Sequence, residues 1–188
     1  TNSAMTNTIE GCAVMSDSAG NLLFYTQGTT IWNKNHSTMS NGTGLLGDQS
    51  STQAAIIIPK PGSKTIYYVF TTDQGGYLGT PTEGLRYSIV NMALMGGLGS
   101  VTSKNILLIK PTTEKLTAVK HSNGADFWVI THDWGNNSFN VYLLTSAGVN
   151  TTPVISSVGT AHSGIYQNTT GYLKASPNRK KLALSHYD

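Results

Sequence analysis

One pattern occurs four times along the sequence: an apolar strand, a short polar turn and a second apolar strand. The four copies read AVMSDSAGNLLFYT, AIIIPKPGSKTIYYVFTTD, TAVKHSNGADFWVITHD and LKASPNRKKLALSHYD. Their central turns contain the Gly, Pro, Asn and Asp residues that tight turns require. Because one hairpin cannot bury both of its faces, the copies must pack against one another. The pattern therefore favours a repeat architecture built from hairpins.

The spacing of the copies predicts a particular architecture. Their first strands begin near Cys12, Ala54, Leu116 and Leu173, which are 42, 62 and 57 residues apart. A repeat of about 40 to 50 residues with four strands, lengthened here by loops, is typical of a β-propeller blade. We therefore predict an all-β fold, a β-propeller of WD-like four-stranded blades, seen as a partial ring of about three and a half blades. Residues 1–188 then form a single partial propeller domain, with blades at about 10–47, 48–110 and 111–160 and an incomplete blade at 161–188.

Helical periodicity is nearly absent, and short runs rich in Val, Ile, Tyr, Phe, Trp and Thr alternate with turn residues. Trp128, inside FWVI, is expected in the core. The expected strands are 12–17, 22–26, 30–33, 54–59, 66–72, 85–91, 106–109, 116–121, 127–132, 139–145, 153–158, 172–175 and 181–185.

Composition excludes several classes of protein. Charged residues make up 11% of the chain and the net charge is +3, without the basic stripe that nucleic acid binding needs. We interpret the short cluster Arg179, Lys180 and Lys181 as a solvated turn. The single cysteine, Cys12, forms no internal disulfide and is interpreted as a small buried residue. No apolar run reaches the ~18 residues of a transmembrane helix, so no transmembrane segment is predicted.

Longer segments carry a resemblance to a known group of proteins. EGCAVMSDSAGNLLFYTQGTTIWNKNHSTM, SSTQAAIIIPKPGSKTIYYVF, GLRYSIVNM, TEKLTAVKHSNGADFWVITH and YLKASPNRKKLALS resemble the N-terminal propeller-like region of large Bacteroidetes cell-surface proteins. Those proteins typically end in a gliding-motility-associated or type IX secretion sorting domain. SPNRKKLALS is also similar to the SPDGKKLAF-type repeat of WD-like propellers, with Asn178 and Arg179 in place of Asp and Gly. The resemblance implies secretion and an extracellular, cell-surface location, and it implies no particular reaction.

In a propeller the long connections gather at one end of the blades, and binding residues concentrate on such loops. The longest loops are DQGGYLGTPTE and GTAHSGIYQNTT. These loops and the DWGNN turn combine aromatic faces with hydrogen-bond acceptors, as sugar recognition needs, whereas the hairpin turns lack both. The predicted ligand-binding residues are Asp73, Tyr77, Glu83, Asp133, Trp134, His162 and Tyr166.

Asp73, Asp133 and Asp188 each lie at the end of the second strand in one copy of the repeat. Such a ring of acids could hold a cation, but we favour Asp residues that accept main-chain N–H bonds in their own turns. No calcium loop is present, and the scattered histidines lack zinc spacing, so no metal and no cofactor are expected. Trp134 either stacks on a sugar or caps the edge of a blade.

These features predict a non-catalytic extracellular binding or scaffold module of a large secreted surface protein, serving adhesion or glycan binding. The expected partners are a polysaccharide or another cell-surface component, and the remaining blades and domains of the same polypeptide; nucleic acid is not expected. The alternative is a glycan-active propeller enzyme that uses carboxylates of the long loops. A glycosidase needs two facing carboxylates about 5 to 10 Å apart. Asp73, Glu83, Glu114 and Asp133 offer candidates, and no spacing selects a pair.

Overall fold

Residues 8–75 and 83–186 are described by the computed structural model, in which about 49% of the chain is β-strand and almost none is helix. The chain is therefore all-β, as predicted. Neither of the helical segments in these residues is long and apolar enough to cross a membrane. The strands are β1 (Ala13–Ser16), β2 (Leu22–Thr26), β3 (Thr30–Asn33), β4 (Thr38–Thr43), β5 (Ala55–Pro59), β6 (Ile66–Thr72), β7 (Leu85–Asn91), β8 (Ser100–Ile109), β9 (Thr112–Lys120), β10 (Phe127–Asp133), β11 (Ser138–Thr145), β12 (Gly148–Val149), β13 (Val154–Ser157), β14 (Leu173–Ala175) and β15 (Leu182–Leu184), with 3-10 helices η1 (Met95–Gly97) and η2 (Tyr166–Thr169).

The first eight strands form one sheet from two successive antiparallel units. Strands β1 to β4 make the first unit and β5 to β8 the second, each running up and down in sequence order. The fourth strands, β4 and β8, join the two units through a parallel pairing of Ser40 with Ser100. The order across the sheet is β1-β2-β3-β4-β8-β7-β6-β5.

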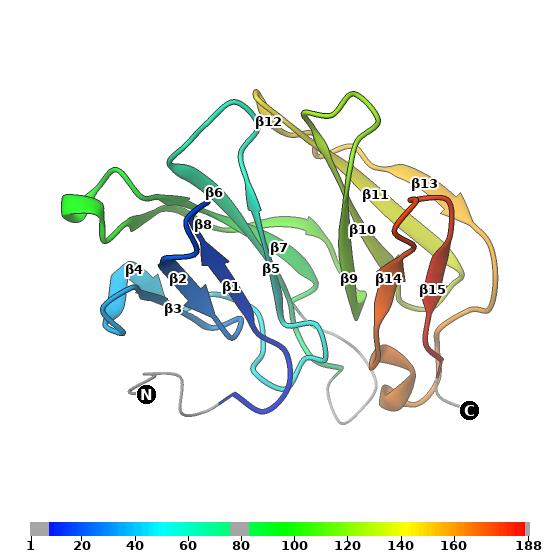
Figure 1. Ribbon diagram of the computed structural model, residues 1–188. Coiled ribbons are helices and arrows are strands. Elements are labelled where there is room, and N and C mark those ends of the chain that lie inside the picture. The colour runs from blue at the N-terminus through cyan, green and yellow to red at the C-terminus, as the bar shows by residue number, and fades with distance from the viewer. Residues whose placement is uncertain (1–7, 76–82, 187–188) are drawn as a thin grey trace.

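The third unit repeats this arrangement with a divided fourth strand. Strands β9, β10 and β11 pair antiparallel, and both β12 and β13 pair with β11. The last hairpin, β14 with β15, is a separate two-stranded sheet. First strands of successive units lie together, because β5 contacts both β1 and β9, and β9 contacts β14. The result is a nearly closed, barrel-like arrangement of sheets (Figure 1).

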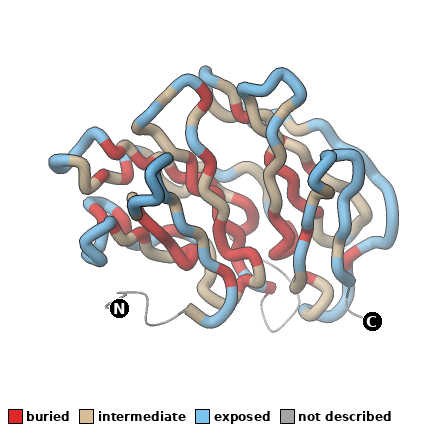
Figure 2. The backbone as a smooth tube through the Cα atoms, viewed as in Figure 1, coloured by how far each residue is buried: buried red, intermediate tan, exposed pale blue. Residues whose placement is uncertain are grey.

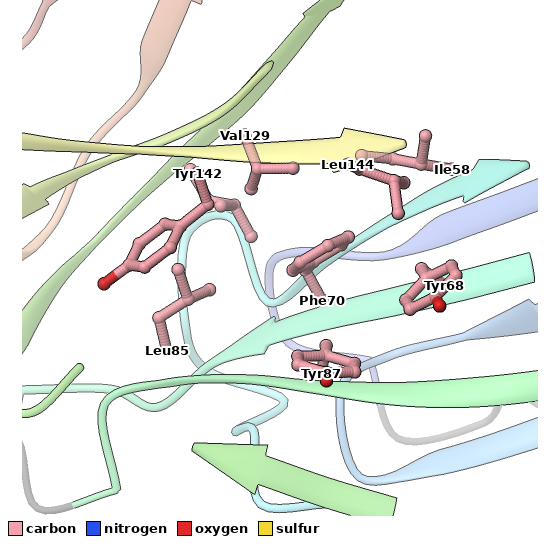
Figure 3. Close-up of a cluster of buried hydrophobic side chains, with 9 residues drawn as sticks. Ile58, Tyr68, Phe70, Leu85, Tyr87, Val129, Tyr142 and Leu144 are labelled. Carbon is pink, nitrogen blue, oxygen red and sulfur yellow. The ribbon is translucent and has the colours of Figure 1, made fainter. Parts of the chain in front are cut away.

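The core lies where the units face each other. One cluster packs Phe24, Ile31 and Met39 of the first unit against Val69 and Val90 of the second. The other cluster joins the second and third units. Figure 3 shows this second cluster, in which the side chains of β5, β6 and β7 meet those of β10 and β11: Ile58, Tyr68, Phe70, Leu85, Tyr87, Val129, Tyr142 and Leu144.

Burial decreases toward the last hairpin (Figure 2). Leu173 of β14 is fully buried, whereas Leu182 of β15 is 43% exposed. Val154 and Ile155 of β13 are 61% exposed each. The outer half of the third unit is therefore less covered than the first two units.

Two sequence-based expectations about burial are wrong. Cys12 is exposed, because it precedes β1, an edge strand that, among the described strands, pairs only with β2. Trp128 is only half-buried, because it lies on the face of β10 that borders the small β14–β15 hairpin. Apolar composition predicted burial at both positions, but neither position has enough neighbouring structure to cover it.

Candidate functional site

The long loops meet at one buried carboxylate, that of Glu114 in β9, which is 2% exposed. Its Oε2 accepts hydrogen bonds from the main-chain N and the hydroxyl of Thr52, both at 2.8 Å. Its Oε1 accepts from the main-chain N of Gly75 at 3.1 Å and from the hydroxyl of Thr169 at 3.2 Å. Glu114 thus accepts four hydrogen bonds from three separate segments of the chain and anchors the loops at this end of the molecule.

The next residue, Lys115, anchors the third of these loops. Its side chain is fully buried, and Nζ donates to the main-chain oxygens of Asn168 at 2.9 Å, Thr169 at 3.0 Å and Thr170. These carbonyls end η2, where helix carbonyls lack partners in the helix itself. Burial lowers the pKa of Lys115 to about 8, and the neighbouring charge of Glu114 opposes this shift.

Gln53 ties two first strands together just beneath the loops. Its Oε1 accepts from the main-chain N of Leu116 at 3.0 Å and of Leu173 at 2.7 Å. One side chain from before β5 therefore bonds to both β9 and β14. This amide fixes the spacing of the units next to the loop anchor.

Asp73 and Glu83 lie at the two ends of one loop. Asp73 is buried, and its carboxylate accepts from the main-chain N of Glu83 at 2.6 Å and of Gly84 at 2.9 Å. Glu83 forms an ion pair with Arg86 at 2.8 Å, and its side chain is 40% exposed. Asp73 thus closes the loop, and Glu83 stays partly accessible. Tyr77, the predicted residue between them, lies outside the described residues.

Asp133 shapes the turn that follows β10. Its Oδ1 accepts from the main-chain N of Trp134 at 2.9 Å, and its Oδ2 accepts from Nδ2 of Asn136 at 2.8 Å. This geometry agrees with a turn-forming Asp, the interpretation favoured from the sequence. Main-chain bonds from Gly135 to His162 at 2.7 Å and from His162 to Asn136 at 3.0 Å join this turn to the 159–170 loop. Asp133, Trp134 and His162 are therefore brought together.

His162 lines a pocket of about 510 Å³ between the third unit and the last hairpin. Its ring is fully buried, Nδ1 lies 3.0 Å from the main-chain oxygen of Asn168, and Nε2 has no hydrogen-bond partner among the described residues. A carbonyl only accepts, so Nδ1 carries the hydrogen and Nε2 presents a lone pair. Burial lowers the pKa of His162 to about 4 and keeps the ring neutral. The apolar walls come from Phe139, Val141, Val158, Leu182 and Leu184.

Two further histidine rings lie close to that of His162, and no pattern in the sequence indicates this cluster. Measured between centroids, the ring of His132 lies 4.3 Å from that of His162, and the ring of His186 lies 4.7 Å from it. Nδ1 of His132 is 2.8 Å from the main-chain oxygen of Asp133, and burial lowers the pKa of His132 as well. The three residues come from different parts of the chain, so no local spacing could indicate their contact.

The remaining predicted residue, Tyr166, opens η2 and is 36% exposed. Trp134, in the turn after β10, is half-buried. Within residues 8–75 and 83–186, no group of three or more His, Cys, Asp or Glu side chains is placed to hold a metal ion. No protein-family model, curated protein or solved structure matches this chain.

Proposed function

We propose that this chain is a non-catalytic binding and scaffold module that recognises a glycan with its long loops. The observation that carries the proposal is that the carboxylates of the loops are already engaged in hydrogen bonds and an ion pair. Asp73, Glu114 and Asp133 each accept hydrogen bonds that hold a loop in place, and Glu83 pairs with Arg86. A general acid or base must reach a proton of the substrate, so acids already bonded to the loops suit a structural role.

The proposed fold behind this function is a β-propeller with WD-like blades, of which the four units are successive members. Three features support it: each of the first two units is a four-stranded antiparallel meander, the first strands lie next to one another, and apolar clusters fill the space between units. The remaining blades and domains of a longer polypeptide are then partners of this sector.

The proposed setting is extracellular, on the cell surface or secreted from it, in a Bacteroidetes-type protein exported by type IX secretion. The low content of charged residues and the sequence resemblance support this setting. The proposed task is adhesion, with a polysaccharide or another cell-surface component as the partner. Two aromatic side chains of the loops, the half-buried Trp134 and the exposed Tyr166, supply flat apolar faces for sugar rings.

A glycan array, together with an assay for released reducing ends, tests this function. We expect binding without turnover, and we expect Trp134→Ala with Tyr166→Ala to weaken binding by about 1 to 3 kcal/mol per stacking contact. Trp32→Ala is a matched control, because Trp32 is half-buried like Trp134 and stacks on Tyr25 at 5.5 Å in the first unit. Product release that stops in Asp73→Asn or Asp133→Asn would instead establish the glycan-active enzyme. Unchanged binding in the Trp134 and Tyr166 variant would contradict the assigned surface.

A further inference from the structure

A second surface lies at the opposite end of the units from the long loops (Figure 1), and it is formed by the turn after β9 and the turn after β14. Nη1 of Arg179 donates to the main-chain oxygen of Lys120 at 3.0 Å, which joins the two turns. Arg179 itself has a φ of 61°, in the left-handed region. A residue other than Gly, Asn or Asp is uncommon in this region, so the turn keeps Arg179 at a conformational cost.

Positive charge gathers on these two turns. Lys120, Arg179, Lys180 and Lys181 are all exposed, and they account for four of the 12 Lys and Arg residues in the chain. The salt bridge found among the described residues is Arg86 with Glu83, so no carboxylate there pairs with these four cations. Between the strands of these two hairpins the acid is Asp126, which accepts a bond from Asn123 at 2.7 Å.

An aromatic ring lies between the cations. Trp128 is half-buried and lines two adjoining pockets of about 260 and about 330 Å³. Arg179 and Val119 line both pockets with it, Lys180 and Lys181 line the first, and Lys120 lines the second. The ring of His121 packs against Trp128 with 5.2 Å between centroids. The surface is therefore a groove with an apolar, aromatic floor and a cationic rim.

We propose that this groove, formed by Lys120, Trp128, Arg179, Lys180 and Lys181 and called here the basic groove, binds an acidic saccharide. The proposal rests on the proposed glycan-binding function and gives it a second site with a defined ligand class. An indole face packs on the apolar face of a sugar ring. The guanidinium of Arg179 retains N–H groups beyond the one bonded to Lys120, and its planar fork matches a carboxylate or sulfate.

The arrangement favours an acidic sugar over other anions. Single-stranded nucleic acid also binds basic grooves with aromatic side chains, but its sites stack successive bases over about 4 to 16 nucleotides, whereas this groove offers the one ring of Trp128. A neutral sugar would use Trp128 and leave four unpaired cations without a role. A carboxylate or sulfate on each sugar ring would use both features at once.

The test measures binding of the 188-residue chain to polygalacturonate and to its methyl ester, which has the same backbone without the charges. We expect binding to polygalacturonate only, and weaker binding as salt screens the charges. Lys180→Glu with Lys181→Glu should lower this affinity at least about tenfold, because like charges then face each other. Lys34→Glu with Lys64→Glu changes the net charge equally at exposed lysines of two other turns, and should leave affinity unchanged. Trp128→Leu keeps an apolar floor without the indole and should also weaken binding.

The outcomes separate this proposal from the function on which it rests. Equal losses in the two charge-reversed pairs, or equal affinity for the methyl ester, would overturn the basic groove. Equal affinity for single-stranded DNA would also overturn it, because the surface would then accept any polyanion. If a neutral glycan binds through Trp134 and Tyr166 while Lys180→Glu with Lys181→Glu has no effect, the basic groove is wrong and the proposed binding function stands. If no glycan binds at all, both proposals are wrong.

Discussion

Glu114→Gln keeps the shape of a buried side chain but replaces one acceptor oxygen by an amide group that only donates. Oε1 accepts the main-chain N–H of Gly75, and Oε2 accepts that of Thr52. Whichever way the new amide is oriented, its NH2 group faces one of these donors. The substitution therefore places two donors against each other in a buried site, where an unpaired polar group is most costly.

The four hydrogen bonds of Glu114 set the size of the loss. A hydrogen bond to a charged group contributes about 1.5 to 3 kcal/mol, and a buried donor left without an acceptor costs about 1 to 3 kcal/mol. One main-chain N–H loses its acceptor in either orientation, whereas a threonine hydroxyl on the same side can rotate to accept from the new amide. We expect the free energy of unfolding to fall by about 2 to 4 kcal/mol.

Urea unfolding measures this loss, and in a chain of this length the melting temperature should fall by roughly 5 to 15 °C. Hydrogen exchange at Thr52 and Gly75 should accelerate more than exchange in β6. Glu83→Gln is the control, because it removes the same charge from a side chain that is 40% exposed, and it should cost no more than about 1 kcal/mol. Equal losses in the two variants, with no selective exchange at the loops, would refute the role of Glu114 as the anchor.

Three other perturbations have expected outcomes. The free energy of unfolding should fall by up to about 3 kcal/mol as pH drops from about 6.5 to 4. In this range the unfolded chain takes up a proton at His162, whereas the buried ring, with its pKa lowered to about 4, does not. Urea unfolding at several pH values should show that stability depends less on pH in His162→Asn. Lys115→Met leaves three carbonyls at the end of η2, those of residues 168–170, without their donor and should lower the free energy of unfolding by about 3 to 5 kcal/mol. A loss under about 1 kcal/mol would contradict the burial argument. Gly84→Ala should lower the free energy of unfolding by more than about 2 kcal/mol, because Gly84 has a φ of 70° and a Cβ there would clash with a main-chain oxygen. Gly20→Ala, at a φ of 84° in open space, should lower it by about 1 kcal/mol. Equal melting temperatures of the two variants would contradict this prediction.

Strands were predictable wherever apolar and β-branched residues form a continuous run. The bounds of β2, β3, β6 and β7 agree with those expected from the sequence. Strand β4 was missed because TMSNGT offers only one buried apolar side chain, Met39, and owes its extended form to pairing with β3 and β8. Local composition cannot reveal a strand whose stability comes from its neighbours.

The position of the loops was predictable, and their anchor was not. Alternation of strands and turns places the long connections at one end, which is where Asp73, Asp133 and His162 lie. In the sequence Glu114 is one of four candidate carboxylates that no spacing distinguishes, and nothing marks Lys115 as buried, since charged residues are rarely buried without partners. Their partners come from residues 52, 75 and 168–170, distances along the chain that no local pattern spans. The role of Glu114 and Lys115 therefore depends on contacts that form only in the folded chain.

The way in which Glu114 holds its loops determines which positions are free to diversify. Two of its four bonds come from main-chain N–H groups, which every residue except proline provides. Position 75 must remain glycine, because a Cβ there would lie 2.2 Å from the hydroxyl oxygen of Thr169. Exposed loop side chains that take no part in these hydrogen bonds, or in those of Asp73 and Asp133, can change while the loops stay in place. A library that randomises Trp134, Tyr166 and their exposed neighbours, with Glu114, Lys115 and Gly75 unchanged, should therefore yield folded proteins with altered ligand preference.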